Sequence, residues 1–220
     1  AYRNIYANQG SMTAGVDGST MDNMSDSRIE KIICSLKSGG YKPNPARRTY
    51  IAKKNSKKKR PLGIPSGDDK LVQEVVRMIL ESIFEPTFSE RSHGFRPKRS
   101  CHTALKQIQN TFTGAHWFVE GDIKACFDSF DHHVLIDLLR RRIDDEAFIS
   151  LMWKFLKAGY MEQWQYHKTY CGTPQGSGIS PLLANIYLSE LDRFMEEYKS
   201  QFDVGSSAKR QRSHEYQAAK

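Results

Sequence analysis

The sequence predicts a mixed α/β (α+β) fold, in which helices are combined with small antiparallel sheets. Apolar residues recur at helical spacing between residues 68 and 85, which predicts a core helix. Two β-prone runs, 48–53 and 61–65, flank a lysine-rich turn and predict a β-hairpin with a basic tip. Residues 160–170 alternate aromatic and polar side chains and predict a second hairpin. The predicted apolar face of the core helix consists of Val72, Val75, Val76, Ile79, Leu80 and Ile83.

A strong positive charge is concentrated in one short stretch of the chain. The 220 residues carry a formal net charge of +8, and 39% of them are hydrophobic, as expected for a folded globule. Between Arg47 and Arg60 there are eight basic residues and no acid. Without these eight, the 33 Lys and Arg residues become 25, the number of Asp and Glu residues. The excess charge is therefore local and favours an anionic partner, the alternatives being a solvated loop or a protein partner.

The cysteines and the hydropathy pattern narrow the class of protein. The four cysteines form no Cys-x-x-Cys pair, so we expect no zinc site. No apolar run reaches the length of a membrane span, about 20 residues, and the N-terminus lacks the profile of a secretory signal. We therefore expect a cytosolic protein in a reducing compartment. The chain begins at Ala1 rather than Met, and we expect it to be a fragment.

Capping side chains predict where the other helices begin. Ser27 with Glu30 has the spacing of a capping box before a run of apolar residues at helical spacing. Three more helices are predicted to begin after N-caps at Ser100, Asp131 and Asp144.

Other stretches are predicted to be irregular or exposed. Residues 1–24 are rich in Gly, Ser, Asn and Asp and should contain little regular structure. An apolar helix is predicted from 181 to 198, and the polar, basic chain beyond Lys199 is expected to be mobile. His132 and His133 are expected near the surface, and they point to different sides of a helical turn, so we expect no shared metal.

The stretch from Trp117 to His132 contains the most informative acid. Aromatic and β-branched residues predict a buried strand through Ile123, with Asp122 near its end. A buried carboxylate is costly unless it is paired, and Mg²⁺ is one partner, with the backbone carbonyl of Ile123 as a second oxygen ligand. A helix cap or an ion pair is the alternative for such an acid. Phe127, five residues after Asp122, could form a wall of the same pocket.

A second stretch, residues 172–188, is a loop rich in Gly and Pro that leads into an apolar helix, so its backbone can approach a ligand closely. Together with residues 117–132 it resembles the third and fourth sequence blocks of reverse transcriptases. The resemblance implies that Asp122 is the catalytic metal ligand and that Phe127 excludes a ribose 2′-OH. It also implies that Gln175 lies beside the incoming nucleotide.

Three further stretches resemble blocks of the same family. The lysine run followed by Arg60-Pro61-Leu62-Gly63-Ile64-Pro65 resembles the first block, which implies that Arg60 and Lys53 hold the nucleotide triphosphate, with Lys54 as the alternative to Lys53. His93-Gly94-Phe95-Arg96-Pro97 resembles the second block in the form typical of group II intron proteins. Residues 1–24 resemble the N-terminal extension of these enzymes, which acts as a lid over the template.

The resemblance also assigns RNA contacts to basic residues. Arg96, Lys98 and Arg99 are implied contacts with the template and primer backbone, and a capped loop with solvated charges is the alternative. The implied contacts in the first hairpin are Arg47, Arg48, Lys54, Lys57, Lys58 and Lys59.

The implied architecture is the fingers and a partial palm of a right-hand polymerase, with the thumb and the rest of the palm absent. Residues 1–45 would be the N-terminal extension and first fingers helix, and 46–92 the fingers. Residues 93–130 would be the palm with the metal-binding strand, and 131–172 a return to the fingers. Residues 173–220 would be a palm helix and a mobile basic tail.

The implied function is RNA-directed DNA synthesis from deoxynucleoside triphosphates on a template-primer, with two Mg²⁺ ions, by a protein that also binds group II intron RNA. The sequence lacks the aromatic-x-Asp-Asp motif that would supply more carboxylates. Asp68-Asp69 and Asp144-Asp145 are better explained as acids at helix N-termini. We therefore expect the isolated chain to be inactive.

Other functions stay open at this stage. One alternative is a non-catalytic maturase, which needs only the RNA-binding surface. Another is a reverse transcriptase of the retron or diversity-generating type. The resemblance implies a cytoplasmic location in a bacterium or an organellar one. Apolar surface exposed by the absent parts would favour a homodimer.

Overall fold

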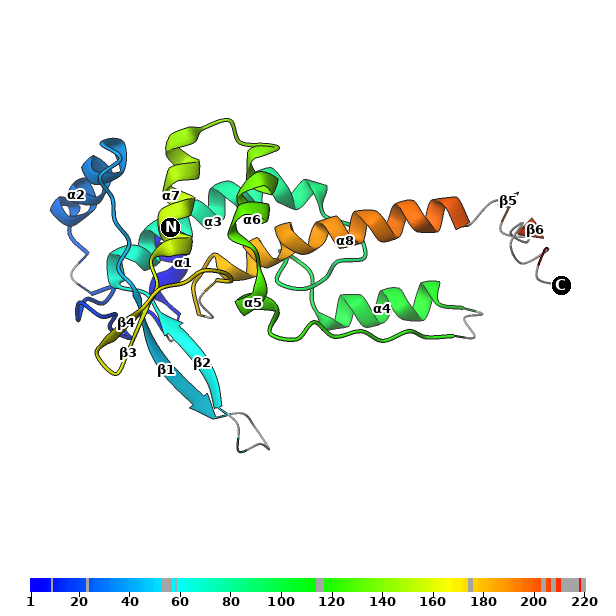
Figure 1. Ribbon diagram of the computed structural model, residues 1–220, viewed down its shortest axis with the longest axis horizontal. Coiled ribbons are helices and arrows are strands. Elements are labelled where there is room, and N and C mark those ends of the chain that lie inside the picture. Colours follow the sequence, from blue (N-terminus) through cyan, green and yellow to red (C-terminus); the bar gives the residue numbers. More distant parts are fainter. Residues whose placement is uncertain are drawn as a thin grey trace.

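The structure is a computed structural model with a helical body and a long β-hairpin that projects from it (Figure 1). It describes residues 1–8, 10–22, 24–52, 57, 59–113, 117–173, 176–202, 205–206, 209–210 and 218.

Helices make up most of the described chain, as the sequence predicted. The helices are α1 (Tyr2–Tyr6), α2 (Asp26–Lys37), α3 (Gly67–Phe84), η1 (Glu85–Thr87), α4 (Cys101–Thr111), α5 (Cys126–Ser129), α6 (His132–Arg140), α7 (Glu146–Lys157) and α8 (Ser180–Phe202). The strands are β1 (Ala46–Ala52), β2 (Lys59–Ile64), β3 (Tyr160–Glu162), β4 (Gln165–His167), β5 (Gly205–Ser206) and β6 (Lys209–Arg210). The predicted mixed α/β class is confirmed.

Both predicted hairpins are present, and they join one sheet. β1 and β2 pair antiparallel from Arg47 opposite Ile64 to Ala52 opposite Lys59, and β3 and β4 form the second hairpin. The strand order is β2-β1-β3-β4, because β3 runs parallel to β1. The sequence did not indicate this parallel contact, since it joins segments that are far apart in the chain. The sheet therefore fixes the two hairpins relative to each other.

The hydrophobic core lies between α3, α6, α7 and α8. α3 contributes Val72, Val76 and Leu80, each at most 2% exposed. The facing helices contribute side chains that are 0% or 1% exposed: Leu135, Leu139, Ile149, Met152 and Leu183. The core thus holds α3 against α8, the helix that follows the Gly/Pro-rich loop.

Two residues of the predicted apolar face of α3 are not part of the core. Val75 and Ile79 lie one turn apart and are 41% and 42% exposed. The periodicity predicted the right helix but too wide a buried face. An apolar stripe shows which residues can be buried, whereas the neighbouring helices decide which are.

Side-chain caps set the starts of two helices as predicted. Ser100 and Thr103 form a capping box at α4. At α6 the Asp131 carboxylate accepts hydrogen bonds from the backbone N–H groups of His133 and Val134. These bonds, that to Val134 first, lower the pKa of Asp131.

Two other predicted caps are wrong by one or two residues. α2 is capped by Ser25 rather than Ser27, and α7 by Asp145 rather than Asp144. In each case the sequence offers two suitable side chains close together. Only the residue just before the first turn can reach the unpaired N–H groups, so the backbone conformation decides between them.

The stretch predicted to be irregular, residues 1–24, contains the short helix α1 (Tyr2–Tyr6), so that prediction is wrong for its first part. The later part, residues 10–22, is irregular as predicted and is called the N-terminal segment here; it packs on the start of α3. Met21 is fully buried in this contact. The Lys70 ammonium of α3 donates three hydrogen bonds, of 2.9, 3.1 and 2.6 Å, to the backbone carbonyls of Gly10, Ser11 and Thr13. One side chain therefore holds three backbone carbonyls within four residues of an irregular segment.

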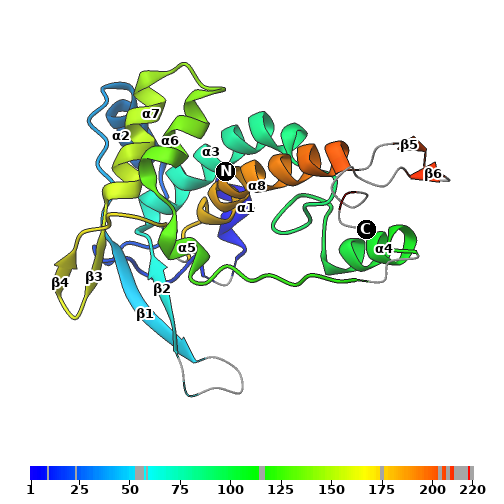
Figure 2. The same ribbon diagram turned by 45° about the vertical axis from the view of Figure 1, so that its right-hand side comes forward.

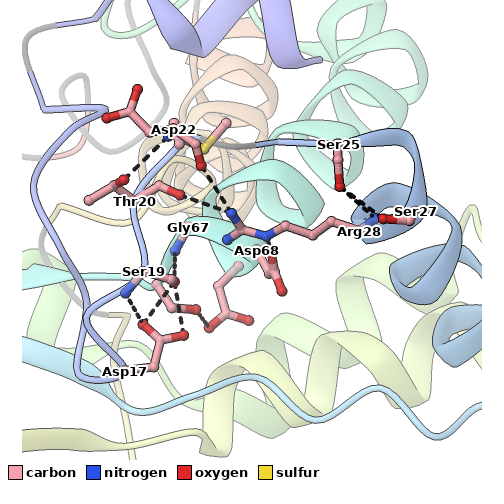
Figure 3. A network of polar contacts seen from close by, with 12 residues as sticks. Asp17, Ser19, Thr20, Asp22, Ser25, Ser27, Arg28, Gly67 and Asp68 are labelled. Atoms are coloured by element: carbon pink, nitrogen blue, oxygen red, sulfur yellow. Dashed lines mark hydrogen bonds and ion pairs between the residues drawn. The ribbon is translucent and has the colours of Figure 1, made fainter.

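Further contacts attach this segment at the N-terminus of α3 (Figure 3). The Gly67 N–H donates to the Ser19 hydroxyl at 2.9 Å. Arg28 of α2 pairs with Asp68 at 2.6 Å, so Asp68 lies in the first turn of α3 as predicted and also bridges to α2. The first turn of α3 is thus the point at which the N-terminal segment and α2 meet.

Replacing Lys70 with Met should loosen the N-terminal segment. Charged hydrogen bonds contribute about 1.5–3 kcal/mol each, but these carbonyls regain water on opening, so we expect a net loss of about 1–3 kcal/mol in the free energy of unfolding. Urea denaturation measures the change. Lys31→Met, at an exposed position of α2, is the control and should be nearly neutral. If Lys70→Met and Lys31→Met lowered the free energy of unfolding equally, Lys70 would not be the residue that holds the N-terminal segment.

Candidate functional site

Asp122 lies on an extended stretch, residues 117–123, that forms no strand. Trp117, Phe118 and Val119 are 92%, 74% and 93% exposed, and Asp122 and Ile123 are also exposed. Figures 1 and 2 show this stretch running from the end of α4 to α5 with no described strand beside it. The prediction of a buried strand is wrong for this chain. A strand needs a neighbouring backbone and an apolar cover, and no described residues supply either.

Phe127 follows on α5 and belongs to an aromatic cluster. Its half-buried ring meets Phe95 and Phe130 edge to face, at centroid distances of 6.4 and 6.3 Å. Phe130 is buried and lies 4.7 Å from the Tyr187 ring of α8. The cluster therefore fixes the position of Phe127, which follows Asp122 by five residues, relative to α8.

The start of the Gly/Pro-rich loop is attached to the segment that contains Phe127. The Thr173 N–H donates to the Phe127 carbonyl at 2.7 Å, and the Gly172 N–H donates to the Phe130 carbonyl at 2.7 Å. Gly172 has φ +75°, and a Cβ there would lie 2.5 Å from the Phe127 carbonyl oxygen. Only glycine permits both the left-handed backbone and this close approach.

The end of the loop is attached to the first hairpin instead. Gly176 has φ +103°, and a Cβ there would lie 2.6 Å from the carbonyl oxygen of Gly63 on β2. Pro174 and Gln175 lie between the two glycine contacts and outside the described residues. The loop thus bridges Phe127 and β2, which brings together three stretches that are far apart in the sequence.

The predicted basic residues of the first hairpin fall into two groups. Lys57, Lys59 and Arg60 are exposed on the part that projects from the body. Lys53, Lys54 and Lys58 lie outside the described residues.

Arg47 and Arg48, at the base of the hairpin, already have protein partners. The Arg47 Nε donates to the Ala14 carbonyl at 2.9 Å, which ties β1 to the N-terminal segment. The Arg48 guanidinium lies over the Tyr160 ring at 3.6 Å from its centroid. These contacts give both residues a structural role at the base of the sheet.

Arg96 is buried and paired within the protein. It is 7% exposed, forms an ion pair with Glu85 at 3.0 Å, and donates to the carbonyls of Ser89 and Ser92. In this structure the donors of Arg96 hold the loop before α4, and its contact with phosphate stays a prediction. A buried Arg is stable only when it is paired in this way.

Arg99 and Lys98 differ from Arg96 and from each other. Arg99 pairs with Glu90, and this contact lowers the pKa of the Glu90 carboxyl. Lys98 is exposed and has a left-handed backbone conformation at φ +59°. Of the three residues predicted to contact the backbone of the template and primer, Lys98 is the one whose side chain is exposed.

His132 is buried, contrary to the prediction of a surface position. It is 3% exposed, and its Nε2 lies 2.7 Å from the Gly172 carbonyl oxygen. His133, the next residue, is exposed as predicted. Nothing in the sequence pattern around His132 indicates that its ring, in the first turn of an amphipathic helix, contacts the loop at Gly172.

The residues from 51 to 208 match the reverse transcriptase (RNA-dependent DNA polymerase) family. This chain is a member of the reverse transcriptase family. It is 63% identical over 92% of its length to the group II intron-encoded protein LtrA of Lactococcus lactis subsp. cremoris. It is 52% identical over 98% of its length to the uncharacterized 91 kDa protein in the cob intron of Schizosaccharomyces pombe. A nuclear intron maturase 1, mitochondrial, of Arabidopsis thaliana is 30% identical over 60% of the chain.

The chain spans only part of these relatives, 34% of the Lactococcus protein and 26% each of the Schizosaccharomyces and Arabidopsis proteins. The predicted resemblance to reverse transcriptases is confirmed. The relatives therefore contain much that this chain does not match.

The oxygen atoms near Asp122 fit Mg²⁺ in type but not in number. The Asp122 carboxylate and the Ile123 carbonyl are hard oxygen donors of the kind that Mg²⁺ prefers. No group of three or more His, Cys, Asp or Glu side chains in the described part of the chain could hold a metal. Burial and then the charge of Asp122 raise the pKa of the Cys126 thiol, which places the carboxylate near α5.

Replacing Phe127 with Ala should admit ribonucleotides in a reverse transcriptase that carries this chain together with the rest of its palm. Bulk rejects a 2′-OH by steric exclusion, so we expect the ratio of ribonucleotide to deoxynucleotide kcat/KM to rise on the order of 10–100-fold. Single-nucleotide extension measures both.

Phe95→Ala is the matched control for this change. It removes an exposed ring from the same aromatic cluster and should leave the ratio unchanged. Equal losses for both nucleotide types in Phe127→Ala would show instead that Phe127 only fills space.

Proposed function

We propose that this chain is the fingers and first part of the palm of an RNA-directed DNA polymerase encoded by a group II intron. The attachment of the Gly172–Gly176 loop to Phe127 on one side and to β2 on the other carries the proposal. It gathers residues from three separate stretches where an incoming nucleotide would bind. Family membership and the similarity to intron-encoded proteins support the same function.

Each candidate residue has a distinct role in this proposal. Asp122 and the Ile123 carbonyl would hold Mg²⁺, which would supply charge stabilisation for phosphoryl transfer. Arg60, together with Lys53, binds the triphosphate. Phe127 occupies the space that a ribose 2′-OH would need, and Gln175 lies beside the nucleotide.

The proposed segments follow the polymerase order. Residues 1–45 are the N-terminal extension and first fingers helix, and 46–92 are fingers. Residues 93–130 carry the metal ligand of the palm. Residues 131–172 return to the fingers, which agrees with the pairing of β3 beside β1. Residues 173–220 would provide a palm helix, α8, and a basic tail, most of which lies outside the described residues.

Support of RNA splicing is a second candidate function, since Lys57, Lys59 and Arg60 are exposed on a projecting hairpin and are independent of the metal site. One relative of this chain is a nuclear intron maturase. A phosphate-binding surface of this kind would grip folded RNA through its backbone, without reading its sequence. Both functions could reside in one protein.

The relatives and the exposed surface also bear on where the protein is located and whether it forms a dimer. Relatives come from a bacterium and from mitochondria, which supports a cytoplasmic or organellar location. None of the helices in the described ranges has the length and apolar character needed to cross a membrane. A homodimer stays a prediction, supported by the exposed apolar side chains on the outer half of α8, which include Phe194, Tyr198 and Phe202.

The isolated chain should have no polymerase activity with Mg²⁺, because it supplies too few carboxylates for two ions. Primer extension with the purified chain tests this. In the longer protein, Asp122→Asn should lower kcat by about 1,000-fold or more while RNA affinity and thermal stability are kept. DNA synthesis by the isolated chain, or a parallel loss of RNA affinity in Asp122→Asn, would contradict the assignment.

The isolated chain should also bind structured RNA through the hairpin tip. Each phosphate that is neutralised releases counterions, so changing Lys57, Lys58 and Lys59 to Gln should lower the magnitude of the slope of log Kd against log salt by about one per lysine in contact. The loss should be similar for unrelated RNAs. Filter binding at several salt concentrations measures the slope.

A second triple variant controls for net charge alone. Lys31, Lys37 and Lys42 are exposed in and after α2, which lies away from the hairpin tip (Figure 1). Changing these three residues to Gln removes the same charge and should leave the slope nearly unchanged. If both triple variants have the same effect, the hairpin is not the binding surface.

A further inference from the structure

The buried side chain of His132 reaches from the first turn of α6 to the Gly/Pro-rich loop. Its Nε2 lies 2.7 Å from the carbonyl oxygen of Gly172. A carbonyl oxygen only accepts, so Nε2 carries the hydrogen and donates. The ring edge faces Trp153 of α7, at a centroid distance of 6.4 Å and an angle of 79°. α6 and α7 thus hold the donor in place, and the loop receives it.

The peptide group between Gly172 and Thr173 is bound on both sides. Its C=O accepts from His132, while its N–H donates to the Phe127 carbonyl at 2.7 Å. The C=O and N–H groups lie in the same peptide plane and point in opposite directions, so each hydrogen bond holds one side of the peptide. A flip of this peptide would break both bonds at once, and it would release the loop from the segment that carries Phe127.

Because residue 172 is a glycine, the orientation of the 172–173 peptide must be fixed by contacts with other residues. Gly172 has φ +75° and no Cβ, so its own backbone does not restrict rotation of the following peptide. Thr173 precedes Pro174, which confines Thr173 to extended conformations. The plane of the 172–173 peptide therefore depends on the hydrogen bonds that its C=O and N–H groups form.

We propose that His132 is a positioning residue that fixes the Gly172–Thr173 peptide, and thereby sets the nucleotide-facing loop against Phe127. This inference rests on the proposed function for its effect on nucleotides, but not for its effect on the loop. Burial strengthens the role, because a carbonyl left without a donor away from water is costly. A neighbouring aromatic ring and a helix N-terminus hold the imidazole, so the loop is positioned by the rigid body of the protein.

The first test measures the loop in this chain alone. In His132→Leu the Thr173 amide should exchange with solvent deuterium about ten-fold faster or more, while amides of the α3 core keep their rates. His132→Gln should restore slow exchange, because the Gln amide places a donor close to the position of Nε2. His102→Leu changes an exposed histidine on α4 and should have no effect. Unchanged exchange at Thr173, or equal acceleration throughout the chain, would overturn the proposal.

The second test uses the longer protein with its polymerase activity. His132→Leu should raise the KM for deoxynucleotides about ten-fold with a smaller change in kcat, and should relax the exclusion of ribonucleotides. His132→Gln should recover most of both. If Thr173 exchange responds but nucleotide selection does not, the proposed link to the nucleotide is overturned. If the wild-type protein has no polymerase activity, the proposed function fails, and deuterium exchange still decides the role of His132 in the loop.

Discussion

A buried carboxylate at the start of α3 is the interaction on which the arrangement of the body depends. Asp69 is 2% exposed and accepts hydrogen bonds from the Tyr41 hydroxyl at 2.7 Å, the Asn44 N–H at 3.0 Å and the Ser66 hydroxyl at 2.5 Å. Burial raises the pKa of this carboxyl, and the three donors offset part of that effect. The partners belong to the segment before β1 and to the turn before α3. One acid therefore joins the entry of the first hairpin to the central helix.

This joint determines where the hairpins can lie. β1 begins at Ala46, two residues after Asn44, and its parallel contact with β3 adds the second hairpin to the same sheet. β2 then passes the end of the Gly/Pro-rich loop at Gly176. The candidate nucleotide site is built on these contacts between backbones. Side chains at the glycine positions would separate the segments by the width of a Cβ, which explains why the loop contains glycine at both ends.

The part of the candidate site that contains Asp122 is exposed rather than packed. Its stretch is extended but lacks a strand partner among the described residues, and its aromatic side chains are exposed. Apolar side chains at this level of exposure stabilise a fold only after something covers them. The relatives are about three to four times longer than the matched region, so they contain enough chain to supply that cover. The part of the candidate site around Phe127 is thus held by contacts within the described chain, while the described residues around Asp122 form no comparable contacts.

The sequence by itself determined the local features of this protein. Helical spacing located α3, and side-chain acceptors located the caps at Ser100 and Asp131. Two β-prone runs around a turn located the first hairpin, and alternation located the second. These signals are local because helices, caps and hairpins form between residues close in the chain. The motifs of the family also placed Asp122, Phe127 and the glycine loop in one predicted site.

Only the tertiary structure decided which residues meet across the chain. Burial of Arg96 against Glu85 and of His132 against Gly172 depends on partners 11 and 40 residues away, and neither side chain has a periodicity that reveals its partner. The predicted strand at Asp122 failed for the same reason, since β structure depends on a neighbour more than on its own residues. Sequence patterns specify what a residue is able to do, and the folded chain decides which of its possible partners is within reach.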